Sequence, residues 1–124
     1  MVSVLHPQDR VRQDAGPVAA MYRDMGAHGA EQVVTRALGE LALTMAGLAS
    51  QVRLRDLSDV ARQVRRLQRM SEQLGMVSLC EVAGDVRICL DRGDATAFAA
   101  VWARLIRVAE QSLSPDRDLL DQSV

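Results

Sequence analysis

Four arginines lie three and four residues apart in the middle of the chain: Arg62, Arg65, Arg66 and Arg69. An α-helix, at about 100° per residue, would place these four side chains within an arc of about 100°. A guanidinium group is planar, charged near neutral pH and able to form two parallel hydrogen bonds with a carboxylate or a phosphate. The spacing therefore predicts a cationic helix face that docks an acidic or phosphorylated partner. The alternative is a solvated face without a partner, because all 15 basic residues of this chain are arginines.

Histidine and cysteine offer little for catalysis or metal binding. The two histidines are His6, near the N-terminus, and His28, beside a pair of glycines. Cys80 and Cys89 would lie on opposite sides of one helix, about 13 Å apart along its axis, so they cannot bridge each other. No histidine cluster or glycine-rich phosphate loop accompanies them. We therefore expect no metal, no cofactor and no catalytic residue.

Composition sets the class of protein. The chain has 124 residues, 48% of them hydrophobic, a formal net charge of −1 and only three aromatic residues. This balance gives no electrostatic bias toward nucleic acid or membrane, and stacking residues for bases are missing. The first residues lack the pattern of a secretory signal, and no uninterrupted apolar run approaches the roughly 20 residues of a membrane span. The sequence predicts a cytoplasmic protein.

Apolar residues recur at spacings of three and four along most of the chain, which is typical of amphipathic helices. The stripes predict helices over about 30–52, 56–74, 77–90 and 95–113, and either Asp56 or Ser58 could cap the second of them. Gly75 stands where a helix ends with positive φ. Helices of this length with short connections favour an all-α fold, an antiparallel up-down four-helix bundle.

Prolines and glycines mark the borders of this bundle. Residues 1–16 show no period and are expected to form a mobile tail. Pro17 can open an additional short N-terminal helix, which Gly26 would end. The helical bundle then occupies 17–114, and 115–124 form a frayed acidic tail.

Leu67, Ser71, Leu74 and Gly75 follow one another at a spacing that is also found in a family of helical domains. The stretch from Asp56 to Leu113 resembles the histidine-containing phosphotransfer (Hpt) domain of bacterial phosphorelays. The family's characteristic helix reads roughly His-x-Leu-Lys-Gly-x-Ser/Ala-x-x-Leu-Gly, and residues 65–75 align with it. The matching positions are Leu67, Ser71, Leu74 and Gly75. The helix and turn that follow in the family are matched by Leu79, Val82, Ala83, Val86, Gly93 and Asp94.

The departures from the family lie at its reactive positions. Arg65 aligns with the phosphoacceptor histidine, Gln68 with the neighbouring lysine, and Arg69 with the small glycine. A guanidinium stays protonated and non-nucleophilic, so it cannot carry a phosphoryl group. The resemblance implies a non-phosphorylatable (pseudo-Hpt) protein without enzyme activity that binds a receiver domain or a histidine kinase. Its expected binding residues are Arg62, Arg65, Arg66, Gln68 and Arg69.

Two other functions remain open from the sequence. A structural module could form a homodimer or an assembly by helix packing, through an apolar patch of Met21, Tyr22, Met25 and Trp102. A true phosphotransferase would have to use another acceptor, for which His28 is the candidate.

Overall fold

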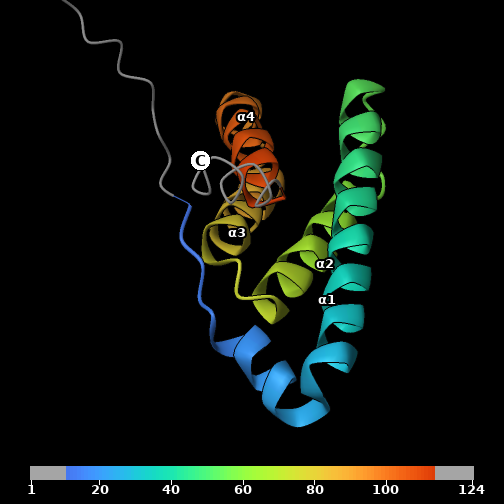
Figure 1. Cartoon of the computed structure of the whole chain (residues 1–124). Helices are drawn as coiled ribbons and strands as arrows, with labels where there is room; N and C mark the ends of the chain where they lie inside the picture. The colour runs from blue at the N-terminus through green and yellow to red at the C-terminus, as the bar shows by residue number, and fades with distance from the viewer. Residues whose placement is uncertain (1–10, 114–124) are drawn as a thin grey trace, which may run out of the picture.

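The computed structural model describes residues 11–113, which contain four helices and no strand (Figure 1). The predictions of an all-α class and of four main helices are confirmed. The helices are α1 (Gly16–Arg53), α2 (Val60–Gln73), α3 (Val77–Arg92) and α4 (Ala95–Ser112). The structure starts α2 at Val60 rather than near Asp56, whose carboxylate instead accepts a hydrogen bond from the Ser58 hydroxyl at 2.7 Å.

One glycine interrupts the long first helix. Gly26 has φ 79° and ψ 169°, a non-helical conformation that side chains with a Cβ rarely adopt. The segment that opens at Pro17, expected as a separate short helix, is here the first part of α1. The chain turns at this point, so the first part of α1 points away from the long second part (Figure 1).

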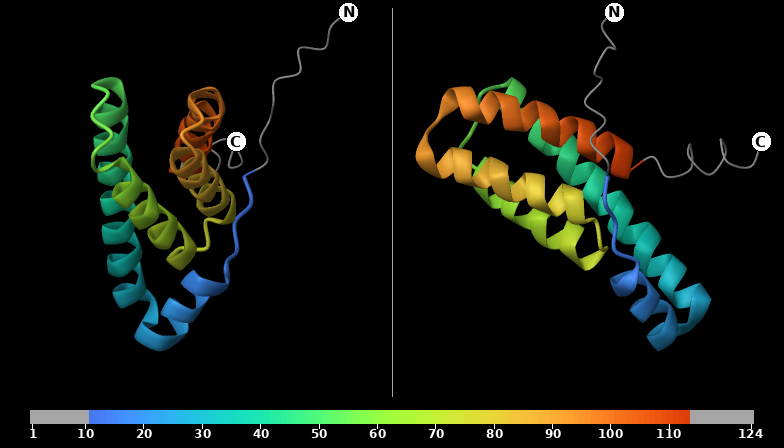
Figure 2. Two further views of the ribbon diagram at one scale, coloured as in Figure 1. Left: turned by 180° about the vertical axis from the view of Figure 1, so that it is seen from behind. Right: turned by 90° about the vertical axis from the view of Figure 1, so that its left-hand side faces the viewer.

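Each helix packs against its neighbour in the sequence: α1 against α2, α2 against α3, and α3 against α4. Figure 2 shows α3 and α4 side by side on one flank of the molecule and α1 on the other. The second helix, α2, therefore lies between α1 and α3 and has neighbours on two sides. Its third side remains open to solvent.

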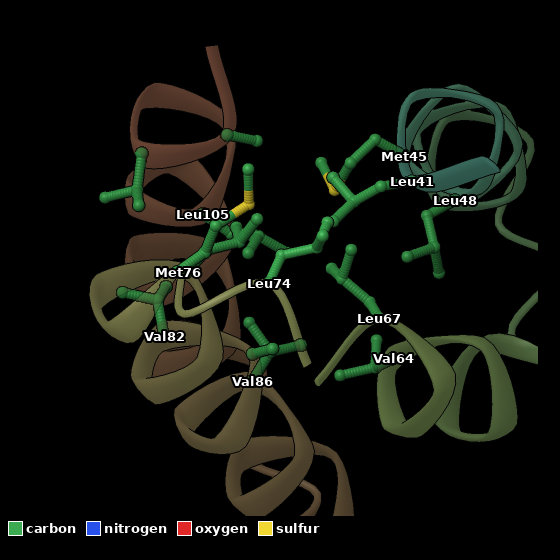
Figure 3. Packing of buried hydrophobic residues seen from close by; sticks show 14 of the residues in the cluster. Leu41, Met45, Leu48, Val64, Leu67, Leu74, Met76, Val82, Val86 and Leu105 are labelled. Atoms are coloured by element: carbon green, nitrogen blue, oxygen red, sulfur yellow. The ribbon is translucent and has the colours of Figure 1, made fainter. Parts of the chain in front are cut away.

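The core draws on all four helices, and their labelled side chains converge in Figure 3. Full burial of one such leucine or valine contributes about 1.5–3 kcal/mol to stability. The residues without solvent exposure include Leu41 and Leu48 of α1, Val64 and Leu67 of α2, Val82 and Val86 of α3, and Leu105 of α4. The turn after α2 has the predicted positive φ, and the turn after α3 has a similar conformation. Gly75 and Gly93 adopt φ of 71° and 65°, and Asp94 caps α4 by accepting the Ala97 N–H at 3.0 Å.

Residues 11–15, which we call the N-terminal strap, lie against the turn between α2 and α3. The Asp14 N–H donates to the Gly75 carbonyl oxygen at 2.7 Å, and the Ser78 N–H donates to the Arg12 carbonyl oxygen at 3.2 Å. The Arg12 N–H donates to the Ser78 hydroxyl at 2.7 Å, and the Arg12 guanidinium forms an ion pair with Glu81. The sequence assigned this segment to the tail 1–16; residues 1–10 and the tail 115–124 lie outside the described residues.

Among residues 11–113, α1 alone is long and apolar enough to cross a membrane by length and hydropathy. Such a helix also occurs in the core of folded domains. Here Leu41, Met45 and Leu48 of α1 are buried in the shared core, while Arg36 and Glu40 are exposed. The apolar stripe of α1 is therefore used in packing against the other helices.

Candidate docking site on α2

The four arginines that the sequence singled out form one exposed face of α2, which we call the arginine face: Arg62, Arg65, Arg66 and Arg69. The opposite side of the same helix holds its buried residues, Val60, Val64, Leu67 and Ser71. Helical periodicity places the charges toward solvent because the apolar positions are fixed in the core. The open third side of α2 is therefore strongly basic.

Arg62 differs from the other three because it has an acidic partner. Its Nε lies 2.7 Å from Asp59 Oδ1 and its Nη2 lies 3.1 Å from Oδ2, a two-point pair at the start of α2. The hydrogen bond from Arg62, together with one from Gln63, lowers the pKa of Asp59 to about 2. The spacing of three residues between Asp59 and Arg62 could have revealed this pair in the sequence. Arg62 therefore stabilises the N-terminus of α2 and is less available for a partner than the other three arginines.

Arg65, Arg66 and Arg69 form no ion pair with any residue between 11 and 113, and we call them the open arginines. Two of the three acidic residues of α3 pair with other arginines. Glu81 pairs with Arg12, and Asp85 lies 3.9 Å from Arg104. Like charges this close on one helix repel each other, so the open arginines lower helix stability slightly unless an anion approaches them.

Gln68, the fifth expected binding residue, does not share the exposed face. Its side chain is half-buried between α2 and α3, where Oε1 accepts a hydrogen bond from Arg87 Nη1 at 3.2 Å. Its Nε2 would lie 2.9 Å from a Cβ at position 84, so Gly84 leaves space for it. Gln68 therefore stabilises the contact between two helices, and it is less exposed than the open arginines.

A cavity of about 380 Å³ lies on the α3 side of α2, next to the N-terminal strap. Its lining includes Glu72 of α2, Cys80 and Glu81 of α3, and Asp14 of the strap. Partial burial raises the pKa of Cys80, and the charges of Glu72 and Glu81 raise it further. The thiol is therefore protonated near neutral pH and is a poor nucleophile. Both Cys80 and Cys89 are free.

His28, the alternative phosphate acceptor, is exposed on α1. Its Nε2 lies 3.3 Å from Gln32 Nε2. His6 lies outside the described residues. Within the part of the chain that is described, no group of three or more histidine, cysteine or acidic residues could hold a metal ion.

No protein-family model, no curated protein and no solved structure matches this chain.

Proposed function

We propose that this chain is a pseudo-Hpt protein that binds the receiver domain of a response regulator, or a histidine kinase, through the open arginines. The observation that carries the proposal is the exposure of Arg65, Arg66 and Arg69 without an ion-pair partner among residues 11–113. They stand on the solvent side of α2, and in the resemblance to the Hpt family Arg65 aligns with the phosphohistidine. A permanently charged group there favours an acidic partner surface.

The same position argues against phosphoryl transfer by this chain. Arg65 occupies the acceptor position, and its guanidinium has no lone pair available for attack on phosphorus near neutral pH. In the proposed complex Arg65 contacts the acidic pocket of a receiver domain, as a charge and hydrogen-bond donor. The chain would then occupy or shield that pocket without relaying phosphate, acting in the cytoplasm and without a cofactor.

The proposal includes a finer arrangement of the fold. The four helices would run up and down as an antiparallel bundle, preceded by the short helical segment before Gly26. Consecutive packing of α1, α2, α3 and α4 supports this arrangement. It leaves α2 with one open side, which a receiver domain would approach.

The experiment is a binding titration of the full chain against each receiver domain of the source cell, first at low salt. We expect binding that weakens when the salt concentration rises from about 0.05 M to about 0.5 M, because exposed charges are screened. The triple variant Arg65→Gln, Arg66→Gln and Arg69→Gln should weaken binding by at least about tenfold, since removing charge–charge contacts at an interface slows association and speeds release.

A matched control removes three positive charges elsewhere. Arg23, Arg36 and Arg92 are exposed and lie outside α2, so replacing each by glutamine changes the net charge equally. This control should retain binding. Equal losses in the two triple variants would indicate attraction without a defined site, and absence of binding to every receiver domain and kinase at low salt would refute the proposal.

A further inference from the structure

The outer face of α1 carries an exposed leucine between two glycines. Leu43 is 74% exposed and lies four residues from both Gly39 and Gly47, so the three share one side of the helix. A Cβ at either glycine would meet nothing within 4 Å. Glycine inside a helix lowers its stability relative to alanine. No contact within the described residues explains these two glycines, whereas a second backbone passing close to α1 would.

A groove of about 310 Å³ lies beside Leu43, between α1 and α2. Apolar atoms of Leu43, Gly47 and Leu48 line it, and Gln51 Oε1, another lining residue, is buried without a hydrogen-bond partner. The groove also carries both signs of charge, with Glu40 from α1 and Arg66 from α2. A protruding leucine, a hollow next to it and two opposite charges thus lie on one face.

We propose that a second copy of this chain docks on this face, with α1 packed antiparallel against α1 about a twofold axis near Leu43. Such an interface is self-complementary: every residue meets the residue equally far from the axis in the partner copy. Gly39 of one copy then faces Gly47 of the other, and each Leu43 enters the hollow between the helices. Glu40 of one copy lies near Arg66 in the groove of the other copy, where their charges attract each other.

Charge complementarity favours a second copy of the chain over other partners of this groove. An acidic partner would be repelled by Glu40 and a basic partner by Arg66, while a copy of the same face presents each charge to its opposite. The face differs from the apolar patch expected from the sequence. Tyr22 and Met25 are exposed before Gly26, whereas Trp102 is half-buried on α4 and stacks on Phe98 with ring centroids 6.0 Å apart.

The first test is sedimentation of the full chain from about 1 µM to about 100 µM, a range that covers micromolar dissociation constants. We expect a concentration-dependent dimer. Leu43→Glu should weaken self-association by at least about tenfold, as the loss of a central apolar contact does. Ile88→Glu is the matched control, because Ile88 is 45% exposed but lies on α3, and it should leave the dimer intact.

Replacing a glycine by alanine distinguishes an effect on the dimer interface from an effect on helix stability. Gly47→Ala should raise the melting temperature of the monomer, because alanine favours the helix and meets nothing within 4 Å. The same variant should weaken dimerisation, because the added methyl keeps the two backbones apart. A higher melting temperature with unchanged self-association would contradict close approach at this position.

Charge reversal gives the sharpest test. Glu40→Arg chains carry two positive charges in the groove and Arg66→Glu chains carry two negative ones, so each alone should self-associate poorly. An equimolar mixture should form heterodimers, because both cross-pairs are then of opposite sign. A mixture that stays monomeric overturns the twofold arrangement, and a strictly monomeric wild-type chain overturns the dimer.

Binding of a monomeric chain to anionic vesicles, lost in Leu43→Glu, would assign the face to lipid and also refute the proposal.

This inference does not rest on receiver binding. Leu43→Glu leaves all three open arginines in place and releases Arg66 from the dimer groove, so the variant is expected to bind receiver domains at least as tightly as the wild-type chain. A chain that dimerises without binding any receiver domain would refute the proposed function alone.

Discussion

The backbone N–H of Asp14 donates a hydrogen bond of 2.7 Å to the carbonyl oxygen of Gly75, joining the strap to the turn between α2 and α3. The contact is so close that a Cβ at position 75 would lie 1.9 Å from the Asp14 carbonyl oxygen. Gly75 also has φ 71°. Position 75 therefore requires glycine for two separate reasons, backbone conformation and the approach of a second segment.

Gly75→Ala and Gly93→Ala separate these two reasons. Both glycines have positive φ, which costs a residue with a Cβ about 1–2 kcal/mol. At Gly93 nothing lies within 4 Å of the new methyl, so that cost should be the whole effect. At Gly75 the methyl must displace the strap, which should add about 1–3 kcal/mol. Denaturant unfolding measures both, and equal losses would contradict the docking of the strap in solution.

Acid should weaken the pair at the start of α2. The pKa of Asp59 is lowered from 3.8 to about 2, chiefly by the hydrogen bond from Arg62. The folded state therefore binds a proton less readily than the unfolded state. The stabilisation is complete above pH 3.8 and is lost as the pH falls toward about 2. Carboxyl chemical shifts in an NMR titration report this pKa, and Arg62→Gln should move it back toward 3.8. Arg36→Gln should leave it unchanged.

Two leucine substitutions test the orientation of α2 and its surroundings. Leu67 has no solvent exposure and lies on the side opposite the arginine face, whereas Leu54 is 71% exposed in the connection before α2. Leu67→Ala should lower the free energy of unfolding by about 2–5 kcal/mol. Leu54→Ala should stay within about 0.5 kcal/mol of the wild type. Similar losses at the two sites, measured by urea unfolding, would be incompatible with this placement of α2.

Restoring a nucleophile tests the resemblance to the Hpt family. In the double variant Arg65→His and Arg69→Gly, an imidazole stands on the exposed side of α2 and bulk beside it is removed. We expect this variant to take up labelled phosphate from a phosphorylated receiver domain, while the wild type and Arg36→His do not. Gln68 is left unchanged, because its Oε1 accepts a hydrogen bond from Arg87 at 3.2 Å.

Two results of the labelling experiment would count against this view. An unlabelled double variant, still folded by circular dichroism, would remove support for the family resemblance. Label on the wild-type chain that disappears in His28→Gln would instead favour the phosphotransferase alternative.

The sequence predicts the helices well because their signals are local. Apolar spacing locates α2, α3 and α4, and single residues such as Gly75 and Asp94 mark their ends. The start of α2 lies after both candidate caps, Asp56 and Ser58, since an aspartate before a helix can bond to a nearby serine instead of the helix N-terminus, as Asp56 does with Ser58. The sequence also places a break at Gly26, and Gly26 has a non-helical φ of 79° there; helical residues continue on both sides, so the two segments form one kinked α1.

The sequence predicts the exposed arginines of the candidate site but not the position of Gln68. Periodicity places the arginines on one side of α2, and the spacing of three residues from Asp59 marks Arg62 as the one that can meet an acid. The pairing of Arg62 with Asp59 depends on how α2 begins. The half-buried position of Gln68 depends on the approach of α3 at Gly84, a contact between helices that no spacing within α2 reveals.

The docking of the strap also has a kinetic consequence. Arg12 and Ser78, which share its hydrogen bonds, stand 66 residues apart in the sequence. Pairs such as α2 with α3 and α3 with α4 are instead joined by short connections. Because closing a long loop costs more entropy than closing a short one, local helix pairs form early and distant contacts form late. We therefore expect the strap to attach late during folding, and a protease to enter the chain there first.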